Sequence, residues 1–278
     1  MNSHKEFSSV PDYLYHYTSI EALACILKDQ TLRLSALTNM DDLFEGQTAE
    51  SSTLASFVCV SSWTEDTVES IPSWREYASL KGGVRIRLKT NPFTKYFFTD
   101  EETLVIKNAK LGINTNVEML LPYNILYSLK YIPMPINCEL LMRVDYTDDE
   151  NLTRPKIAEY CEGGATVAFG RLGLHKRTAW RHQREWRYRV LITPINLFEF
   201  KTEDVDLDAF NIEIGRRYGR LSPTSFVHLT IRDDAFSEMQ ITTSPGISAG
   251  NMILVDLLKE KYNPSMQITK SSLEGALR

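Results

Sequence analysis

The spacing of apolar residues predicts four helices. Between positions 20 and 29, Ile20, Leu23, Ala24 and Leu27 recur every three or four residues, which places them on one helical face. Ser19 directly precedes this run, and serine is a preferred cap at a helix N-terminus. Weaker patterns predict helices over Ser73–Leu80, Tyr123–Tyr131 and Met252–Tyr262.

Alternating and continuous apolar runs predict a larger set of strands. Val84–Leu88 alternates apolar residues with arginines, so we expect a strand with one wet face. Further strands are expected over Tyr13–Tyr17, Thr31–Ser35, Phe57–Val60, Leu104–Ile106, Glu185–Leu191, Phe226–Ile231 and Met266–Thr269. Because strands and helices follow one another irregularly and not as a βαβ repeat, the predicted fold class is α+β.

The composition is that of an ordinary globular protein, with 278 residues, 43% of them hydrophobic and 24% charged. A chain of this length buries most of its apolar surface, and no linker divides it. We therefore expect a single domain over residues 1–278, with residues 1–11 as a flexible N-terminus. No signal peptide is recognised, and no apolar run approaches the roughly 20 residues of a membrane span. These features favour a cytoplasmic location away from membranes.

Four cysteines lie isolated in the sequence, without zinc spacing: Cys25, Cys59, Cys138 and Cys161. Cys25 and Cys59 fall in apolar patterns, so we expect both to be buried free thiols in a reducing compartment.

Charge is unevenly distributed along the chain. The formal charge of −5 argues against bulk electrostatic capture of nucleic acid. Between Arg171 and Arg189, however, seven lysines and arginines accompany one acid, Glu185. This basic tract could form a local anion site.

Two short segments near the N-terminus carry candidate chemistry. His16 stands at a strand end before a helix, where a histidine is either a structural hydrogen-bonding group or a functional one. The loop Asn39–Glu45 clusters acids that could bind a metal, although it lacks the register of a calcium loop. Capping or a solvated loop is the alternative interpretation of this segment.

A third segment, Ser61-Ser62-Trp63, follows a buried strand. Small hydroxyls next to an indole suit a planar ligand that stacks and accepts hydrogen bonds. A strand end with a core tryptophan explains the same residues, so both interpretations stay open.

The basic strand around Glu185 is the fourth segment. Alternation places Gln183, Glu185, Arg187 and Arg189 on one face. A carboxylate between arginines should be firmly ionised, either in a structural ion pair or as a group that stabilises a cationic transition state. Glycosidic cleavage passes through such an oxocarbenium-like state, and nearby arginines could hold phosphates. Serine-hydrolase, Walker, dinucleotide-fold and zinc-protease motifs are absent from the sequence.

Five motifs, taken in order, resemble a bacterial domain-of-unknown-function family, number 2971: His16–Ser19, Asp41–Glu45, Ser61–Trp63, Trp74–Ala78 and Glu185–Tyr188. The resemblance covers nearly the whole chain, including the ending Ser271–Arg278. Where the family has Asn and Pro in its acidic motif, this chain has Asp41 and Leu43. The family carries no settled activity.

A more distant resemblance to ADP-ribosyltransferase folds implies an activity. Those folds carry a His or Arg on a first strand, a hydroxyl or aromatic motif on a second, and Gln/Glu-x-Glu on a third. His16-Tyr17-Thr18, Ser61-Ser62-Trp63 and Gln183-Arg184-Glu185 match that order. The resemblance implies a mixed or antiparallel split-sheet core with peripheral helices.

The same resemblance implies roles at a site for NAD. His16 would bind a ribose, Ser61 and Ser62 would support the site, and Trp63 or Tyr17 would stack on nicotinamide. Glu185 would bind the ribose hydroxyl and stabilise the oxocarbenium, and Gln183 would orient the acceptor. The remaining candidates for nucleotide contacts are Thr18 and Arg187.

Three hypotheses of function follow. The first is NAD-dependent ADP-ribosyl transfer, or NAD cleavage, with a protein or nucleic acid as the acceptor. The second is a non-catalytic ligand- or partner-binding module in which Glu185 and Arg187 form a structural ion pair. The third is a nucleic-acid-acting protein that uses the tract Arg171–Arg189.

Overall fold

The computed structural model describes residues 10–51, 53–97, 118–137, 139–161, 164–196 and 207–277. The chain divides into two compact units, and each is assembled from separate stretches of sequence. Unit 1 comprises residues 1–30, 63–92 and 231–278, and unit 2 comprises 31–62 and 93–230. Because neither unit is continuous, no composition break marks a boundary. That the two units make up one domain stays a prediction.

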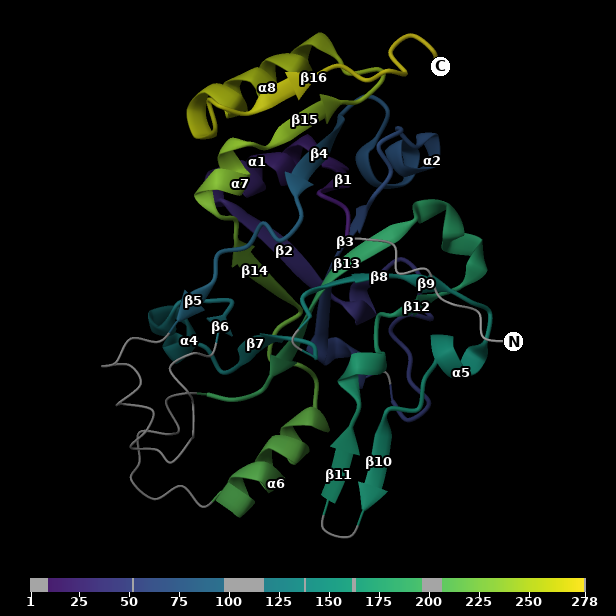
Figure 1. Cartoon of the computed structure of the whole chain (residues 1–278), viewed down its shortest axis with the longest axis vertical. Helices are drawn as coiled ribbons and strands as arrows, with labels where there is room; N and C mark the ends of the chain where they lie inside the picture. The colour runs from purple at the N-terminus through teal and green to yellow at the C-terminus, as the bar shows by residue number, and fades with distance from the viewer. Residues whose placement is uncertain are drawn as a thin grey trace. The chain divides into compact units, whose positions relative to one another are not determined.

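Unit 1 is built on a sheet whose centre is the long antiparallel pair of β1 (Tyr13–Ser19) and β4 (Gly83–Lys89). On one side of β1, Tyr15 pairs with Thr64 at the end of β3 (Val58–Thr64). On the other side, β4 pairs with β15 (Gln240–Thr243), and β15 pairs in parallel with β16 (Gln267–Thr269). Figure 1 shows β15 and β16 next to the long C-terminal helix α8.

The two longest helices of unit 1 begin at serine caps. Ser19 accepts a hydrogen bond from the Ala22 N–H and starts α1 (Ile20–Asp29), as predicted. Ser248 caps α8 (Ala249–Tyr262) in the same way. Among its described residues, this unit also contains the helical segments α2 (Ile71–Ser73), the π-helix η3 (Trp74–Ala78) and α7 (Asp233–Ser237).

Unit 2 is organised around β13 (Glu185–Thr193), a strand whose first six residues are all buried. It pairs with β3 and, antiparallel, with β7 (Ile132–Pro135) and β8 (Leu141–Arg143). β3 also pairs with β2 (Thr31–Ala36), which pairs with β14 (Phe226–Thr230). The strands of both units are therefore mostly antiparallel with a parallel minority, and the predicted α+β class is confirmed.

Within the described residues of unit 2, further elements accompany these strands. Its other strands are β5 (Tyr96–Phe97), β6 (Glu118–Met119), β9 (Asp145–Tyr146), β10 (Ala158–Cys161), β11 (Gly164–Val167) and β12 (His175–Lys176). Its α-helices are α4 (Tyr123–Ser128), α5 (Glu150–Thr153) and α6 (Leu207–Tyr218). Its 3₁₀ turns are η1 (Leu37–Asn39), η2 (Leu54–Phe57), η4 (Phe169–Arg171) and η5 (Thr178–Gln183). In Figure 1, β10 and β11 project as a hairpin.

Several expectations about exposure are corrected. Cys25 is exposed, because it lies off the α1 face formed by Ile20, Leu23, Ile26 and Leu27, whereas Cys59 is buried as predicted. Burial raises the pKa of the Cys59 thiol to about 12, so this thiol is unreactive at neutral pH.

The predicted wet face of Val84–Leu88 is wrong at Arg85, which is only 4% exposed because its guanidinium lies over the Tyr15 ring. The predicted helix Ser73–Leu80 begins instead at Ile71 and continues as η3.

Other expectations fall outside the described residues. They are the strand Leu104–Ile106, the side chains of Cys138 and Cys161, and most of the flexible N-terminus. Within the described part of the chain, no helix is both long and apolar enough to span a bilayer.

Candidate functional site

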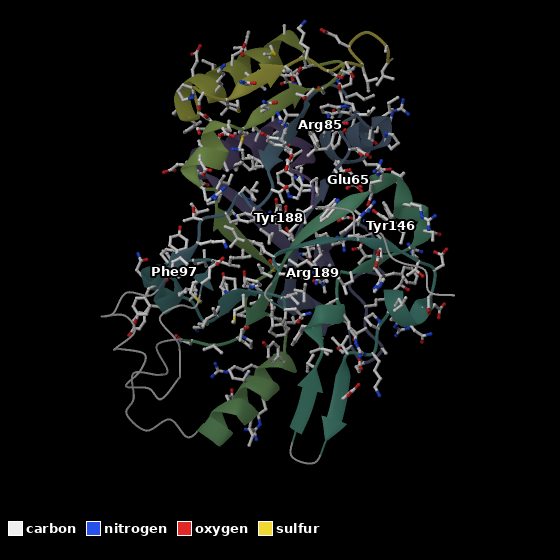
Figure 2. All side chains as sticks on the ribbon, in the orientation of Figure 1. Glu65, Arg85, Phe97, Tyr146, Tyr188 and Arg189 are labelled. Carbon is white, nitrogen blue, oxygen red and sulfur yellow. The ribbon has the colours of Figure 1, made fainter. Side chains whose placement is uncertain are left out.

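A tight turn of the backbone presents Glu185 at the start of β13. The 3₁₀ turn η5 ends at Arg184, whose φ of 44° is left-handed, and the strand begins at the next residue. The Glu185 N–H donates to the Tyr146 hydroxyl oxygen at 2.8 Å. This backbone contact fixes the point at which the strand enters the sheet. Tyr146 is labelled in Figure 2.

Five side chains form a buried ionic cluster, called here the Glu185 cluster: Glu45, Lys176, Gln183, Glu185 and Arg187. Arg187 donates two hydrogen bonds to the Glu185 carboxylate, from Nε to Oε1 at 2.5 Å and from Nη2 to Oε2 at 3.0 Å. Lys176 Nζ lies 3.2 Å from Glu185 Oε2 and donates to Gln183 Oε1 at 2.7 Å. Glu45 completes the set, since it pairs with Lys176 at 3.0 Å and with Arg187.

The four charges of the Glu185 cluster cancel one another, two acids against two bases. The side chains of Glu45, Glu185 and Arg187 are 3% exposed or less, so water screens these pairs weakly. Burial alone would raise the pKa of Glu185, but the charges of Arg187 and Lys176 outweigh it and hold the pKa near 2. Glu185 is therefore an anion throughout the physiological range, as the sequence predicted.

The hydroxyl predicted to accompany Glu185 lies beside it. Ser62, near the end of β3, hydrogen-bonds the Glu185 side chain, and β3 and β13 are paired neighbours. Ser61 is buried, as expected of a residue within a covered strand. The structure thus brings together Ser62, Gln183, Glu185 and Arg187, all within unit 2.

The other candidate residues, His16, Tyr17, Thr18 and Trp63, belong to unit 1. The His16 and Trp63 rings lie 5.0 Å apart at an interplanar angle of 33°. Tyr17 is buried edge-on against Trp74, and its hydroxyl accepts a hydrogen bond from the Ser70 N–H at 2.8 Å. These contacts make the Tyr17 ring part of the local core.

The acidic loop 39–45 is buried at two of its acids, Asp42 and Glu45. Asp42 is buried and accepts two hydrogen bonds from Arg177, at 3.1 Å from Nε and 2.8 Å from Nη2. Glu45 is buried in the Glu185 cluster, while Asp41 is exposed. The solvated-loop interpretation is therefore wrong for Asp42 and Glu45, since each carboxylate is neutralised by a base from the tract 171–189. Among the residues described, no three metal-ligating side chains gather at one point.

The basic tract is less available than its sequence indicates. Lys176 and Arg187 are buried in the Glu185 cluster. Arg189, labelled in Figure 2, is fully buried and donates to the carbonyls of Gly170 and Leu172. Burial, with the charge of Arg187, lowers the pKa of Arg189 to about 10. Three of the seven cations are therefore buried, Lys176 on β12 and Arg187 and Arg189 on β13, and a local anion site on the tract stays a prediction.

Sequence reasoning missed Glu45, Lys176 and Tyr146 as partners of Glu185. Tyr146 contacts Glu185 across 39 residues and Lys176 reaches it from β12, so no local pattern connects them. The one available signal was the acid at position 45 in the loop motif.

Comparison with known proteins gives one match. Curated proteins and solved structures yield none. Residues 73–188 match the family model described as a protein of unknown function (DUF2971). This segment contains the motifs Trp74–Ala78 and Glu185–Tyr188, and it ends on the strand that carries Glu185. The match supports the resemblance to that family noted in the sequence.

Proposed function

We propose that the protein is an ADP-ribosyltransferase-like protein that cleaves NAD, with Glu185 as the carboxylate that stabilises the transition state. In this reaction the bond between nicotinamide and ribose breaks, and its electron pair leaves with nicotinamide. The ribose becomes an oxocarbenium-like cation, and an acceptor nucleophile or water adds to it and releases a proton. A carboxylate that is always ionised favours that cation electrostatically.

The observation that carries the proposal is the pairing of Glu185 with Ser62. The two side chains come from neighbouring strands of one unit and are hydrogen-bonded. The resemblance to ADP-ribosyltransferases assigns a hydroxyl of one strand and a glutamate of another to the same site. Gln183, the other member of the Gln-x-Glu motif, lies within the same cluster through Lys176.

Access to Glu185 depends on Lys176. The carboxylate is 3% exposed, so a ribose hydroxyl must replace an existing partner of Oε2. The Lys176 contact at 3.2 Å is longer than the Arg187 contact at 3.0 Å. Lys176 also keeps Gln183, Glu45 and the Trp180 ring, 4.7 Å away, as partners. In this proposal Lys176 moves aside and Arg187 continues to orient the carboxylate.

The resemblance also assigns nucleotide contacts to four residues of unit 1: His16, Tyr17, Thr18 and Trp63. Of these, His16 is the most informative to replace, because it is partly exposed while Tyr17 and Trp63 are core residues.

The test measures, by chromatography, the rate at which the purified full chain releases nicotinamide from NAD. Wild-type protein should release nicotinamide, and Glu185→Gln should reduce the rate by at least about 100-fold. Ser62→Ala keeps every charge of the cluster and should reduce the rate less. Glu118→Gln is the matched control, since it removes an exposed acid of unit 2 that pairs with Lys95.

Thermal melts accompany these assays. Because Glu185 is buried between two bases, Glu185→Gln destabilises the fold under any function, and activity must be compared at a temperature where both proteins are folded. Absence of NAD binding and of nicotinamide release in wild-type protein would reject the proposal.

A second candidate function is a non-catalytic binding module in which the Glu185 cluster is purely structural. The balanced charges and deep burial of the cluster favour it. It predicts that wild-type protein leaves NAD intact, and that Glu185→Gln changes stability alone.

A further inference from the structure

The two faces of the unit 1 sheet have opposite character. On one face lie Leu14, Ile86 and Ile241, all fully buried. The other face carries aromatic, cationic, amide and hydroxyl side chains, and no aliphatic one, along β1, β4, β15 and β16. On this face β1 carries Tyr13, Tyr15 and Tyr17, and β4 carries Arg85, Arg87 and Lys89. Next to them, β15 carries Gln240 and Thr242, and β16 carries Gln267 and Thr269.

Two Tyr–Arg pairs repeat along this face. The Arg87 guanidinium carbon lies 3.6 Å from the centroid of the Tyr13 ring, and that of Arg85 lies 3.8 Å from the Tyr15 ring. Each arginine thus lies over a tyrosine of the neighbouring strand, diagonally across the pair. The second pair is displaced from the first by two residues, about 7 Å along the strand. Tyr13, Tyr15, Arg85, Arg87 and Gln240 are called here the Tyr–Arg face.

The guanidinium groups of this face lack acidic partners. Within the described residues, Arg85 Nε and Arg87 Nε are buried without a hydrogen-bond acceptor, and no carboxylate pairs with either side chain. Arg85 is 4% exposed, and its Nη2 donates hydrogen bonds to the carbonyls of Asp66 and Thr67. Arg87, Tyr13 and Tyr15 are partly exposed. Lys89, at the end of the row, is paired with Glu238 at 2.6 Å. The positive charge of Arg87 is therefore available to a ligand.

Polar groups extend the Tyr–Arg face toward the sheet edge. Gln240 donates to Gln267 at 3.1 Å, and the hydroxyls of Thr242 and Thr269 lie 3.2 Å apart. At the opposite end the face is closed, because Tyr17 is buried under the segment that contains Ser70 and Trp74. The open part is thus the region of Tyr13, Arg87 and Gln240. Arg85 is labelled in Figure 2.

We propose that the Tyr–Arg face binds single-stranded nucleic acid. A guanidinium stacked on a tyrosine presents its outer plane to a base and its N–H edges to a phosphate. Tyr13 and Tyr15 are both partly exposed and stand two residues apart on β1, beside the partly exposed Arg87. Two successive rings next to a cation suit adjacent bases and a phosphate of one strand better than a single nucleotide. The absence of aliphatic side chains on this face disfavours an apolar peptide as the occupant.

This binding site goes beyond the proposed function and does not depend on it. The Tyr–Arg face lies wholly in unit 1, and the Glu185 cluster lies wholly in unit 2. An experiment on one can fail while the other holds.

The test is fluorescence anisotropy of a labelled 12-nucleotide oligo(dT) titrated with the full chain at low and moderate salt. Arg87→Gln should weaken binding on the order of tenfold, and it should lower the slope of log affinity against log salt by about 0.7. Arg87→Lys keeps the charge but loses the planar stack, so we expect an intermediate affinity. Arg33→Gln is the matched control, because Arg33 lies over the Phe226 ring of unit 2 at 4.8 Å.

Melting curves confirm that each variant is folded. Equal weakening by Arg33→Gln and Arg87→Gln would overturn the proposal, as would unchanged affinity in Arg87→Gln or absence of binding by wild-type protein.

A competition experiment then separates a polymer from a smaller anion as the ligand. If thymidine monophosphate or inorganic phosphate displaces the oligonucleotide at equal phosphate concentration, the face is a mononucleotide or anion site and the proposal fails.

Discussion

Arg187 and Arg87 are both arginines on a β-strand, yet they are held in opposite ways. Arg187, in unit 2, is 1% exposed and bonded to Glu185, Glu45 and the Gly173 carbonyl. Arg87, in unit 1, lies on the Tyr13 ring and has no acidic partner among the residues described. A buried cation that is fully paired maintains a structure, whereas a partly exposed cation on an aromatic ring can bind something else.

The comparison also explains why similar sequences produce different sites. Both arginines belong to strands with alternating basic residues, Arg85-Ile86-Arg87 and Arg187-Tyr188-Arg189. In unit 2, acids from a distant loop and from the same strand neutralise Arg187, and backbone carbonyls accept hydrogen bonds from Arg189. In unit 1, tyrosines of the neighbouring strand take the place of acids. Neighbouring strands therefore decide the role of each arginine.

The largest expected effect is at Arg187. Arg187→Met removes the base that binds two buried carboxylates and leaves Glu185 and Glu45 with Lys176 alone, so unfolding free energy should fall by about 3–5 kcal/mol. Urea unfolding measures it. The control Arg232→Met removes an exposed base paired with Asp234 and should change stability by less than about 1 kcal/mol. Equal losses of unfolding free energy in Arg187→Met and Arg232→Met would mean that the buried ion pairs of the Glu185 cluster stabilise the fold no more than an exposed pair does.

A pH effect of intermediate size should appear at Glu185. Its folded pKa lies near 2, below the value of 4.5 expected when unfolded. The stability due to its ionisation is therefore fully present above about pH 5 and is lost as the pH falls toward 2. The difference in unfolding free energy between wild-type protein and Glu185→Gln should therefore shrink as the pH falls from about 5 toward 2. Urea unfolding at pH 7 and pH 3 measures the difference, and a gap that stays constant would contradict the assigned ionisation.

The smallest stability effect is expected at Arg87. Arg87→Gln loses a cation–π contact worth about 0.5–1 kcal/mol, but it also relieves the burial of an Nε–H without an acceptor. The net change in unfolding free energy should stay within about 0.5 kcal/mol. A loss above about 2 kcal/mol would assign Arg87 to the framework of unit 1 and remove the contrast with Arg187.

Local patterns predicted the elements well where one face is apolar. The helix Ile20–Asp29 and its Ser19 cap, the strand from Glu185 and the buried strand before Ser61 all follow from spacing and capping chemistry. The pattern was less informative where polar side chains are buried. Arg85, Asp42 and Glu45 were expected near water, because a sequence shows a charge but not the partner that neutralises it.

For the candidate site, the sequence identified Glu185, Gln183, Arg187 and the hydroxyl of Ser62. Alternation along β13 accounts for Glu185 and Arg187, and the order of the motifs for Ser62. Gln183 lies in η5, before the strand, and joins the cluster through Lys176, which alternation did not predict. The sequence did not show that Lys176, Arg187 and Arg189 are buried, since Lys176 and Arg187 pair with Glu45 of a distant loop. The Tyr–Arg face was not predicted, because it requires the register of β1 against β4.

The sequence by itself determined the α+β class, the main helices and strands, and the permanent charge of Glu185. These properties depend on apolar period, caps and neighbouring charges along the chain. Tertiary structure decided which arginines are neutralised and which stay available. A salt bridge or a stacked ring acts only at contact distance, and contacts such as Glu45 with Arg187, or Tyr13 with Arg87, join residues separated by more than seventy positions.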